Sequence, residues 1–166
     1  SICSLTKTKH YLIVEYSNGV VGCLVRYDLA NGKTEEIKLP GTGSVGCSCP
    51  DWKTDNCLVF ITSWTSPVTI YDMDAQKQTF TKSIFNSDVV YPGFEELVSE
   101  EVEVPGHDGT MVPLSIVHKK GIAMNGSNSC ILDGYGAYGI SASPRFSIRY
   151  SLAKKGVVLA FAHPRG

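Results

Sequence analysis

The stretch that decides the fold reads ILDGYGAYGI at residues 131–140, where an apolar strand end passes into three glycines interleaved with two tyrosines. Glycine lets the backbone approach a ligand closely, so this turn is suited to chemistry. Residues 157–162, VVLAFA, form a near-continuous apolar run, which is typical of a parallel strand buried on both faces. The chain from residue 130 onward therefore predicts a strand, a glycine-rich turn, a connecting segment and a second, parallel strand.

The connecting segment carries conflicting signals. Ser143 is a possible helix N-cap, Pro144 suits the first helical position, and Gly156 can end a helix whose last turn holds two lysines. Its apolar residues, however, are spaced closer to two than to 3.6 residues apart. We give the capping signals more weight and predict a helix from Pro144 to Lys155.

Residues 9–84 show a different pattern, in which short strand-like runs alternate with turn signals about every 8 to 12 residues. This spacing is typical of sandwiches, barrels and propeller blades. A similar run into Tyr-Asp occurs at Tyr27 and at Tyr71, an offset of 44 residues that matches the period of propeller blades. The predicted strands cover 11–16, 23–29, 34–39, 58–63, 69–74 and 79–84, and Asn31-Gly32 is a hairpin signal because both residues tolerate positive φ.

Between Phe85 and Glu96 the periodicity fades into the composition of a linker, so we place a domain boundary there and divide the chain into residues 1–90 and 91–166. Beyond it, two strands at 96–104 and 111–117 flank the turn His107-Asp108-Gly109 and predict an antiparallel hairpin.

The charge of the chain argues against two classes of partner. With 15 basic and 16 acidic residues the net charge is -1, and there is no cluster of positive charge of the kind that nucleic acid or an anionic membrane requires. No apolar run approaches the length of a membrane span, and no signal-peptide pattern opens the chain. We therefore expect a cytoplasmic protein without a nucleic-acid or membrane partner. The first residue is Ser1, which suggests a fragment or a processed chain.

Six cysteines allow three disulfides in principle, but a core this apolar at this size does not need them, so we expect reduced thiols. Cys47, Cys49 and Cys57 lack the spacing of a zinc cluster and have no histidine nearby in the sequence. We expect no metal and no cofactor.

Four motifs in one order resemble the prolyl oligopeptidase family of serine peptidases. They are an "xDGxxVP" hairpin at 107–113, a "GYGxxG" turn at 134–139, an "xxRGG"-like strand exit at 162–166, and an "S-[FW]-T-x-P-x-x-[IL]-Y" stretch at 63–71. Asp133 stands where family members often have Tyr, and Pro164 where Val or Ile is frequent; neither departure removes a role proposed below.

The resemblance implies a fold of β plus α/β class: the last blades of a β-propeller over residues 1–90, then the N-terminal part of an α/β-hydrolase domain over 91–166. It implies a serine-type endopeptidase that cleaves short peptides with a Ser/Asp/His triad. No G-x-S-x-G nucleophile elbow occurs in this sequence, so the triad is absent from it and we expect the isolated chain to be inactive. Its intramolecular partner would be the remainder of the hydrolase domain and propeller.

Two site residues carry over from the family. Tyr135 occupies the position of the tyrosine whose hydroxyl donates to the oxyanion of the tetrahedral intermediate, and Tyr138 that of an aromatic ring near the S1 pocket. The alternative is that both tyrosines only pack beneath the turn. His163 precedes any nucleophile, whereas the hydrolase order places the catalytic histidine last, so we reject it as the base. We expect His10, His107 and His118 to be solvated surface residues and Arg165 to have a structural role.

Cleavage after Pro or after basic residues is left open, because the residues that would decide it are not in the sequence. Two other classes of function also stay open: a non-catalytic β-rich interaction module with an appended βα segment, and a related hydrolase such as an acylaminoacyl or dipeptidyl peptidase.

Overall fold

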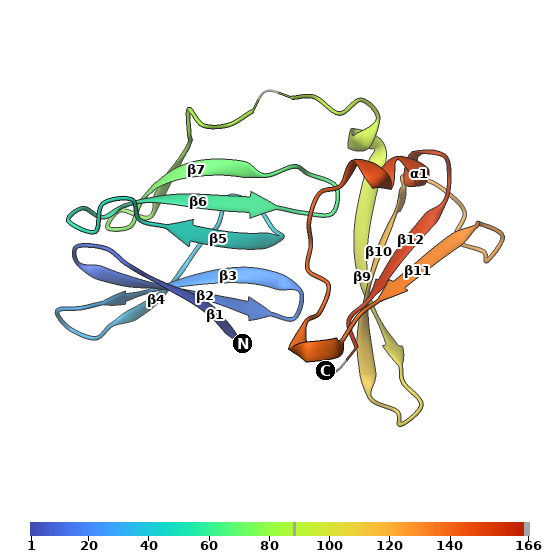
Figure 1. The fold of residues 1–166 in the computed structure, drawn as a ribbon, viewed down its shortest axis with the longest axis horizontal. Helices are drawn as coiled ribbons and strands as arrows, with labels where there is room; N and C mark the ends of the chain where they lie inside the picture. Colours follow the sequence, from blue (N-terminus) through green and yellow to red (C-terminus); the bar gives the residue numbers. More distant parts are fainter. Residues whose placement is uncertain (88, 165–166) are drawn as a thin grey trace. The chain divides into compact units, whose positions relative to one another are not determined.

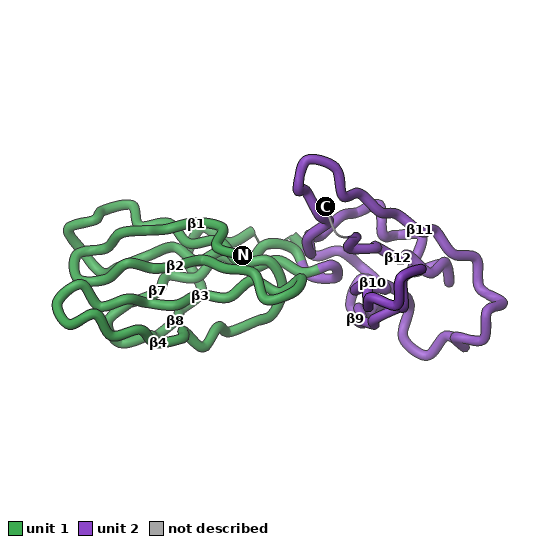
Figure 2. Tube along the Cα trace, turned by 90° about the horizontal axis from the view of Figure 1, so that it is seen from below, with its two compact units in different colours: residues 1–63, 67–89 green, residues 64–66, 90–166 purple. Residues whose placement is uncertain are grey.

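The structure is a computed structural model that describes residues 1–87 and 89–164. The chain divides into two compact units, which Figure 2 colours separately. The first unit contains residues 1–63 and 67–89, and the second contains Trp64–Ser66 and the residues from Val90 onward. Asp88 of the predicted linker and the Arg165-Gly166 exit motif lie outside the described residues.

Two four-stranded sheets build the first unit (Figure 1). Each is a meander in which every strand pairs antiparallel with the next, the arrangement of a propeller blade. One sheet contains β1 (Ile2–Lys7), β2 (Tyr11–Asn18), β3 (Val21–Asp28) and β4 (Thr34–Ile37). The other contains β5 (Ser44–Ser48), β6 (Asn56–Thr62), β7 (Thr69–Asp74) and β8 (Thr79–Lys82).

Each of the six strand runs predicted from the sequence contains a strand, with ends shifted by a few residues. The sequence did not predict β1, which is exposed at every residue except Thr6, or β5, which is rich in small residues and is held by its pairing with β6. The hairpin at Asn31-Gly32 is present, but only Gly32 of the pair has a positive φ, 74°. The loop is longer than a two-residue turn, because the Asp28 N–H donates to Lys33 O.

A single apolar core joins the two sheets of the first unit. Its largest fully buried side chains are Ile13 and Leu24 from the first sheet and Val59 and Met73 from the second. Along β6, the buried side chains of Cys57, Val59 and Ile61 alternate with half-buried ones, so the buried set lies on one face of the sheet.

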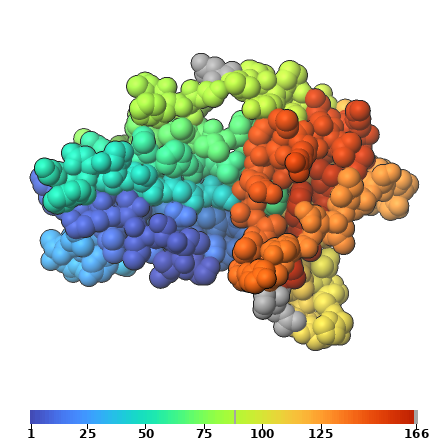
Figure 3. All heavy atoms as spheres, in the orientation of Figure 1, coloured from blue at the N-terminus to red at the C-terminus, as the bar shows by residue number. Residues whose placement is uncertain are grey.

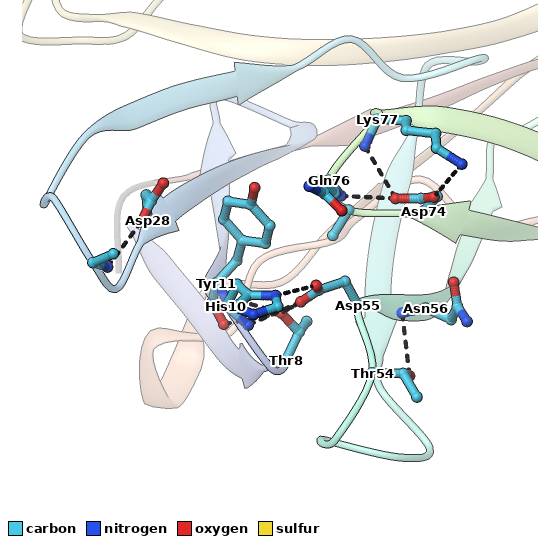
Figure 4. A network of polar contacts seen from close by, with 12 residues as sticks. Thr8, His10, Tyr11, Asp28, Thr54, Asp55, Asn56, Asp74, Gln76 and Lys77 are labelled. Carbon is cyan, nitrogen blue, oxygen red and sulfur yellow. Dashed lines mark hydrogen bonds and ion pairs between the residues drawn. The ribbon is translucent and has the colours of Figure 1, made fainter.

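Polar groups join the same two sheets at one end (Figure 4). The Asp55 carboxylate, just before β6, accepts hydrogen bonds from Thr8 Oγ1 at 2.8 Å and from the His10 N–H at 2.9 Å, and it lies 2.6 Å from His10 Nδ1. In addition, Arg26 of β3 donates to the backbone oxygens of Ala75 and Gln76 in the β7–β8 turn. Side chains from one sheet thus hold the turns of the other.

The second unit is built on one mixed sheet with the strand order β11-β12-β10-β9. Its strands are β9 (Leu97–Pro105), β10 (Met111–Lys119), β11 (Cys130–Gly134) and β12 (Val158–Ala162). The antiparallel hairpin predicted around residues 107–109 is confirmed, and its turn, coloured yellow, projects from the unit (Figures 1 and 3). The predicted parallel pair is confirmed as well: β11 pairs with β12 from Cys130 opposite Val158 to Gly134 opposite Ala162.

The predicted helix over 144–155 is mostly wrong. Within residues 144–155, the helical residues form only a 3-10 turn, Ile148–Tyr150, and the four-residue helix α1, Ser151–Lys154. Ser147, rather than Ser143, caps it by accepting the Arg149 N–H, and Ser147 is extended. The stop signal was right, because Gly156 follows the helix with φ 89°.

Aromatic side chains dominate the core of the second unit. Trp64 stacks on Phe161 of β12 with ring centroids 4.3 Å apart and an angle of 9° between the planes. Phe94 of the 3-10 turn Phe94–Glu96 contacts Phe146, with centroids 5.0 Å apart. In the described part of the chain, no helix is long and apolar enough to cross a membrane.

Candidate active-site turn

The glycine-tyrosine turn follows the C-terminal end of β11, which is an edge strand of the sheet in the second unit. In parallel α/β sheets, ligands bind at the carboxyl ends of strands. Tyr135 follows the strand directly and is 50% exposed, and Tyr138 is 94% exposed. Tyr138 also has φ 58°, a left-handed conformation that is unusual for a residue with a side chain and that recurs at functional sites. Neither tyrosine is buried beneath the turn.

A pocket of about 360 Å³ lies beside the turn. Tyr135 lines it and Tyr138 does not. The other lining residues come from the end of β11, the segment that follows the turn, and the aromatic core: Trp64, Asp133, Gly134, Ile140, Ser141, Ala142, Ser143, Arg145, Tyr150 and Phe161. A larger pocket, of about 600 Å³, lies on the first unit around Cys57 and Met73 and contains none of the candidate site residues.

The pocket holds both signs of charge and an unsatisfied donor. Burial raises the pKa of Tyr150, and the nearby Arg145 guanidinium opposes that rise, while Asp133 adds to it. The indole N–H of Trp64 is buried without a hydrogen-bond partner among the described residues. A buried donor without a partner costs about 1 to 3 kcal/mol. The pocket is therefore lined by both polar and aromatic side chains.

A chain of polar contacts that the sequence did not predict connects buried Ser115 and His163 with the exposed residues Glu101 and Ser141. Ser115 of β10 is fully buried, and its Oγ lies 2.8 and 2.7 Å from the two carboxylate oxygens of Glu101 on β9. The same Oγ lies 2.7 Å from Nε2 of His163, which follows β12. His163 Nδ1 in turn lies 3.4 Å from Oγ of Ser141, a residue that lines the pocket.

This cluster has the residue types of a catalytic triad but not its order. In a triad the acid contacts the histidine, which contacts the serine, so that the base can remove the serine proton. Here the serine stands between the acid and the histidine, and the hydroxyl is inaccessible to a substrate. Ser115 is therefore not a nucleophile, and the rejection of His163 as the base is consistent with this geometry.

The register of the β9–β10 hairpin is the sequence signal from which the contact between Glu101 and Ser115 could have been predicted. Once the turn is placed at residues 107–109, antiparallel pairing sets Ser115 opposite Glu101, as observed. His163 was harder to place, because its position depends on β12 pairing antiparallel with β10.

The predicted surface histidines divide into three cases. His107 is exposed, as predicted. His10 is exposed but bound to Asp55, and the hydrogen bonds from His10 and Thr8 lower the pKa of Asp55 even though burial by itself would raise it. The prediction for His118 was wrong, because the side chain is buried and lies between Lys119 O at 2.9 Å and Glu100 at 3.3 Å.

The six cysteines are free thiols. Burial is the main cause that raises the pKa of Cys49 to about 11, and contacts with Cys47 and burial raise the pKa of Cys57 as well. Over residues 1–87 and 89–164, no group of three or more His, Cys, Asp or Glu side chains is arranged to hold a metal ion.

Comparison with known proteins points to one family. Residues 1–84 match the family model of the prolyl oligopeptidase N-terminal β-propeller domain. The chain is 31% identical to a prolyl endopeptidase of Elizabethkingia miricola, over 94% of this chain and 22% of that protein. It is 35% identical to dipeptidyl aminopeptidase BI of Pseudoxanthomonas mexicana, over 82% of this chain and 19% of that protein.

Solved structures give the same result. A post-proline cleaving enzyme from Rickettsia typhi superposes with a TM-score of 0.81 at 26% identity, over 99% of this chain and 24% of that one. Oligopeptidase B from Leishmania major shares the fold with a TM-score of 0.83, at 24% identity over 99% of this chain and 25% of that one. The chain thus spans about a fifth of the length of the curated relatives it matches. Its first 84 residues and its similarity to these peptidases show that the chain belongs to the prolyl oligopeptidase family.

Proposed function

We propose that this chain is part of a cytoplasmic serine-type oligopeptidase that hydrolyses short peptides. Its first unit would supply the last blades of a β-propeller, and its second unit would supply the first strands of an α/β-hydrolase domain. The nucleophile, the acid and the base would come from residues that this chain does not contain, so the chain would be inactive by itself.

The observation that carries the proposal is the position of Tyr135. It stands at the carboxyl end of a parallel strand, half exposed, beside a pocket. A phenolic hydroxyl at such a place donates a hydrogen bond to the negative charge that develops on a carbonyl oxygen during attack. The partner donor would be a backbone N–H beside the absent serine. Tyr138, which is exposed and lies outside this pocket, would offer its ring to the substrate side chain at S1.

The balance of charge in the pocket gives no preference for a basic substrate side chain. Asp133 would favour one, but Arg145 lines the same pocket and would oppose it. We therefore propose two substrate classes to compare: peptides with Pro before the cleaved bond, and peptides with a basic residue there.

The test uses the longer reading frame that contains this sequence, expressed beside the 166-residue chain. Fluorogenic peptides with Pro or Arg before the cleaved bond should be hydrolysed by the longer protein and not by the chain alone. Tyr135→Phe should lower kcat about 10²- to 10³-fold, the effect of removing one oxyanion donor. Tyr138→Ala should raise KM. Tyr27→Phe, in the first unit, is the matched control.

Three outcomes would contradict the proposal. Turnover by the purified 166-residue chain would show that the chain carries its own nucleophile. A longer protein that has no serine elbow and hydrolyses neither peptide would favour the non-catalytic interaction module. Full activity in Tyr135→Phe would remove the oxyanion role.

A further inference from the structure

The contact chain from Glu101 through Ser115 and His163 to Ser141 fixes where its protons lie. The Ser115 hydroxyl has a single proton, and an ionised carboxylate can only accept hydrogen bonds. Because both oxygens of Glu101 lie within 2.8 Å of Ser115 Oγ, that proton points to Glu101. The 2.7 Å contact between Ser115 Oγ and His163 must then be donated by the ring, so Nε2 carries a proton.

The protonation of Nε2 also decides the state of the other ring nitrogen of His163, Nδ1. In a neutral imidazole only one nitrogen carries a proton, so Nδ1 of His163 presents a lone pair. Its neighbour is the hydroxyl of Ser141, 3.4 Å away, which can donate to it. All the donors in the chain of contacts therefore point the same way, from Ser141 through His163 and Ser115 to Glu101.

This chain of hydrogen bonds connects the catalytic turn to the sheet. His163 is held from two sides, because its backbone N–H donates to Pro113 O of β10 while its ring contacts Ser115 of the same strand. Ser141 belongs to the exposed segment that follows Tyr135 and lines the same pocket. The segment contains Tyr138, a left-handed residue with a side chain, whose backbone conformation requires support from outside.

We propose that His163 is a positioning residue: locked as its Nε2–H tautomer by Ser115 and Glu101, it holds Ser141 and with it the turn that carries Tyr135. The positioning role rests on the proposed function, whereas the tautomer and the direction of the hydrogen bonds do not. Second-layer groups of this kind orient the residues that touch the substrate.

The tautomer is tested by long-range ¹H–¹⁵N correlation NMR of the 166-residue chain at an alkaline pH, at which imidazoles are uncharged. His163 should show the Nε2–H pattern. His118 is an internal control with the opposite tautomer. Its Nδ1 contacts the Lys119 carbonyl, which can only accept a hydrogen bond, so Nδ1 of His118 must carry the proton. Ser115→Ala should convert His163 to a mixture of tautomers and leave His118 unchanged. An Nδ1–H pattern for His163 in the unaltered chain would overturn the assignment.

The positioning role is tested by peptidase kinetics of the longer enzyme. Ser141→Ala alters an exposed residue, so the protein should fold, and kcat should fall about tenfold with KM within about twofold, as expected for a misplaced group that acts on the transition state. Ser141→Thr keeps the hydroxyl and should restore kcat. Ser115→Ala should match Ser141→Ala, and the double variant should be no worse than either, because both break one chain of contacts. His118→Gln is the control.

The outcomes separate the two claims. If the unaltered longer enzyme is active and Ser141→Ala keeps its kcat, the positioning role is wrong and the proposed function stands. If the unaltered enzyme hydrolyses no peptide, the proposed function and the positioning role both fail, and only the tautomer assignment remains.

Discussion

Asp55 links the two sheets of the first unit through hydrogen bonds to the turn of the other sheet. It is 12% exposed and accepts hydrogen bonds from Thr8 and His10, which lie in the β1–β2 turn of the other sheet (Figure 4). Burial by itself disfavours the charged carboxylate, and these donors more than compensate, so the net effect is a lowered pKa. A hydrogen bond to a charged group contributes about 1.5 to 3 kcal/mol.

Asp55→Asn should therefore lower the free energy of unfolding by about 1 to 3 kcal/mol at pH 7. Because the folded pKa is depressed, the stabilisation by Asp55 is present above the unfolded pKa and is lost as the pH falls through the folded value. Urea unfolding between pH 7 and pH 3 checks both effects, and the variant should show a weaker loss of stability on acidification.

Asp28→Asn is the matched control for that experiment. Its carboxylate accepts hydrogen bonds within its own turn, from the Ala30 N–H and from Asn31 Nδ2, and an amide oxygen can replace the first contact. If the two variants lose equal stability, the link between the sheets is not the cause of the Asp55 effect.

At the scale of the element, Gly22 sets how closely β3 approaches β5. A Cβ at Gly22 would lie 2.5 Å from Val45 Cγ1 and 2.7 Å from the Val45 backbone N, and a backbone atom cannot move aside without shifting its strand. Backbone conformation is not the reason for this glycine, because its φ lies outside the left-handed region. The glycine is required by the packing of one sheet on the other.

Gly22→Ala should destabilise the chain by about 1 to 3 kcal/mol, the usual range for overpacking a filled interior. Gly46→Ala in β5 is the matched substitution, because its nearest neighbour, Phe60 Cδ2, would be 3.9 Å away, an ordinary contact. Thermal unfolding followed by far-UV circular dichroism checks the pair. Equal midpoints for the two variants would contradict the close approach of β3 and β5.

Elements that follow from local pattern were predictable, and those that depend on distant partners were not. The strands β2, β3, β6 and β7 carry alternation and turn signals in their own residues. In contrast, β5 is a strand because β6 pairs with it, and the segment 144–147 is not helical although its caps suit a helix. The same division holds for the candidate site. Tyr135 and Tyr138 were found from a contiguous motif, while Glu101, Ser115, His163 and Ser141 come together only when four separate segments of the chain are placed in space.

At the scale of the whole molecule, the second unit presents an unpaired sheet edge. β11 is the edge strand of the order β11-β12-β10-β9, and its five residues are all exposed. Leu132, 68% exposed, is the most exposed large apolar side chain of the strand. Unpaired backbone groups beside exposed apolar side chains are a template for pairing with another chain.

The isolated chain should therefore self-associate through β11, and Leu132→Lys should reduce that association, because a lysine on an edge strand must lose water when a second strand pairs there. Leu29→Lys is the matched control: Leu29 is 46% exposed but lies in a turn of the first unit, outside any strand. Sedimentation velocity over a range of concentrations measures the effect. The Leu132 variant should stay monomeric at concentrations where the unaltered chain and the Leu29 variant form larger species, with an unchanged circular dichroism spectrum. If both lysine variants reduce association equally, added charge and not the strand edge is responsible.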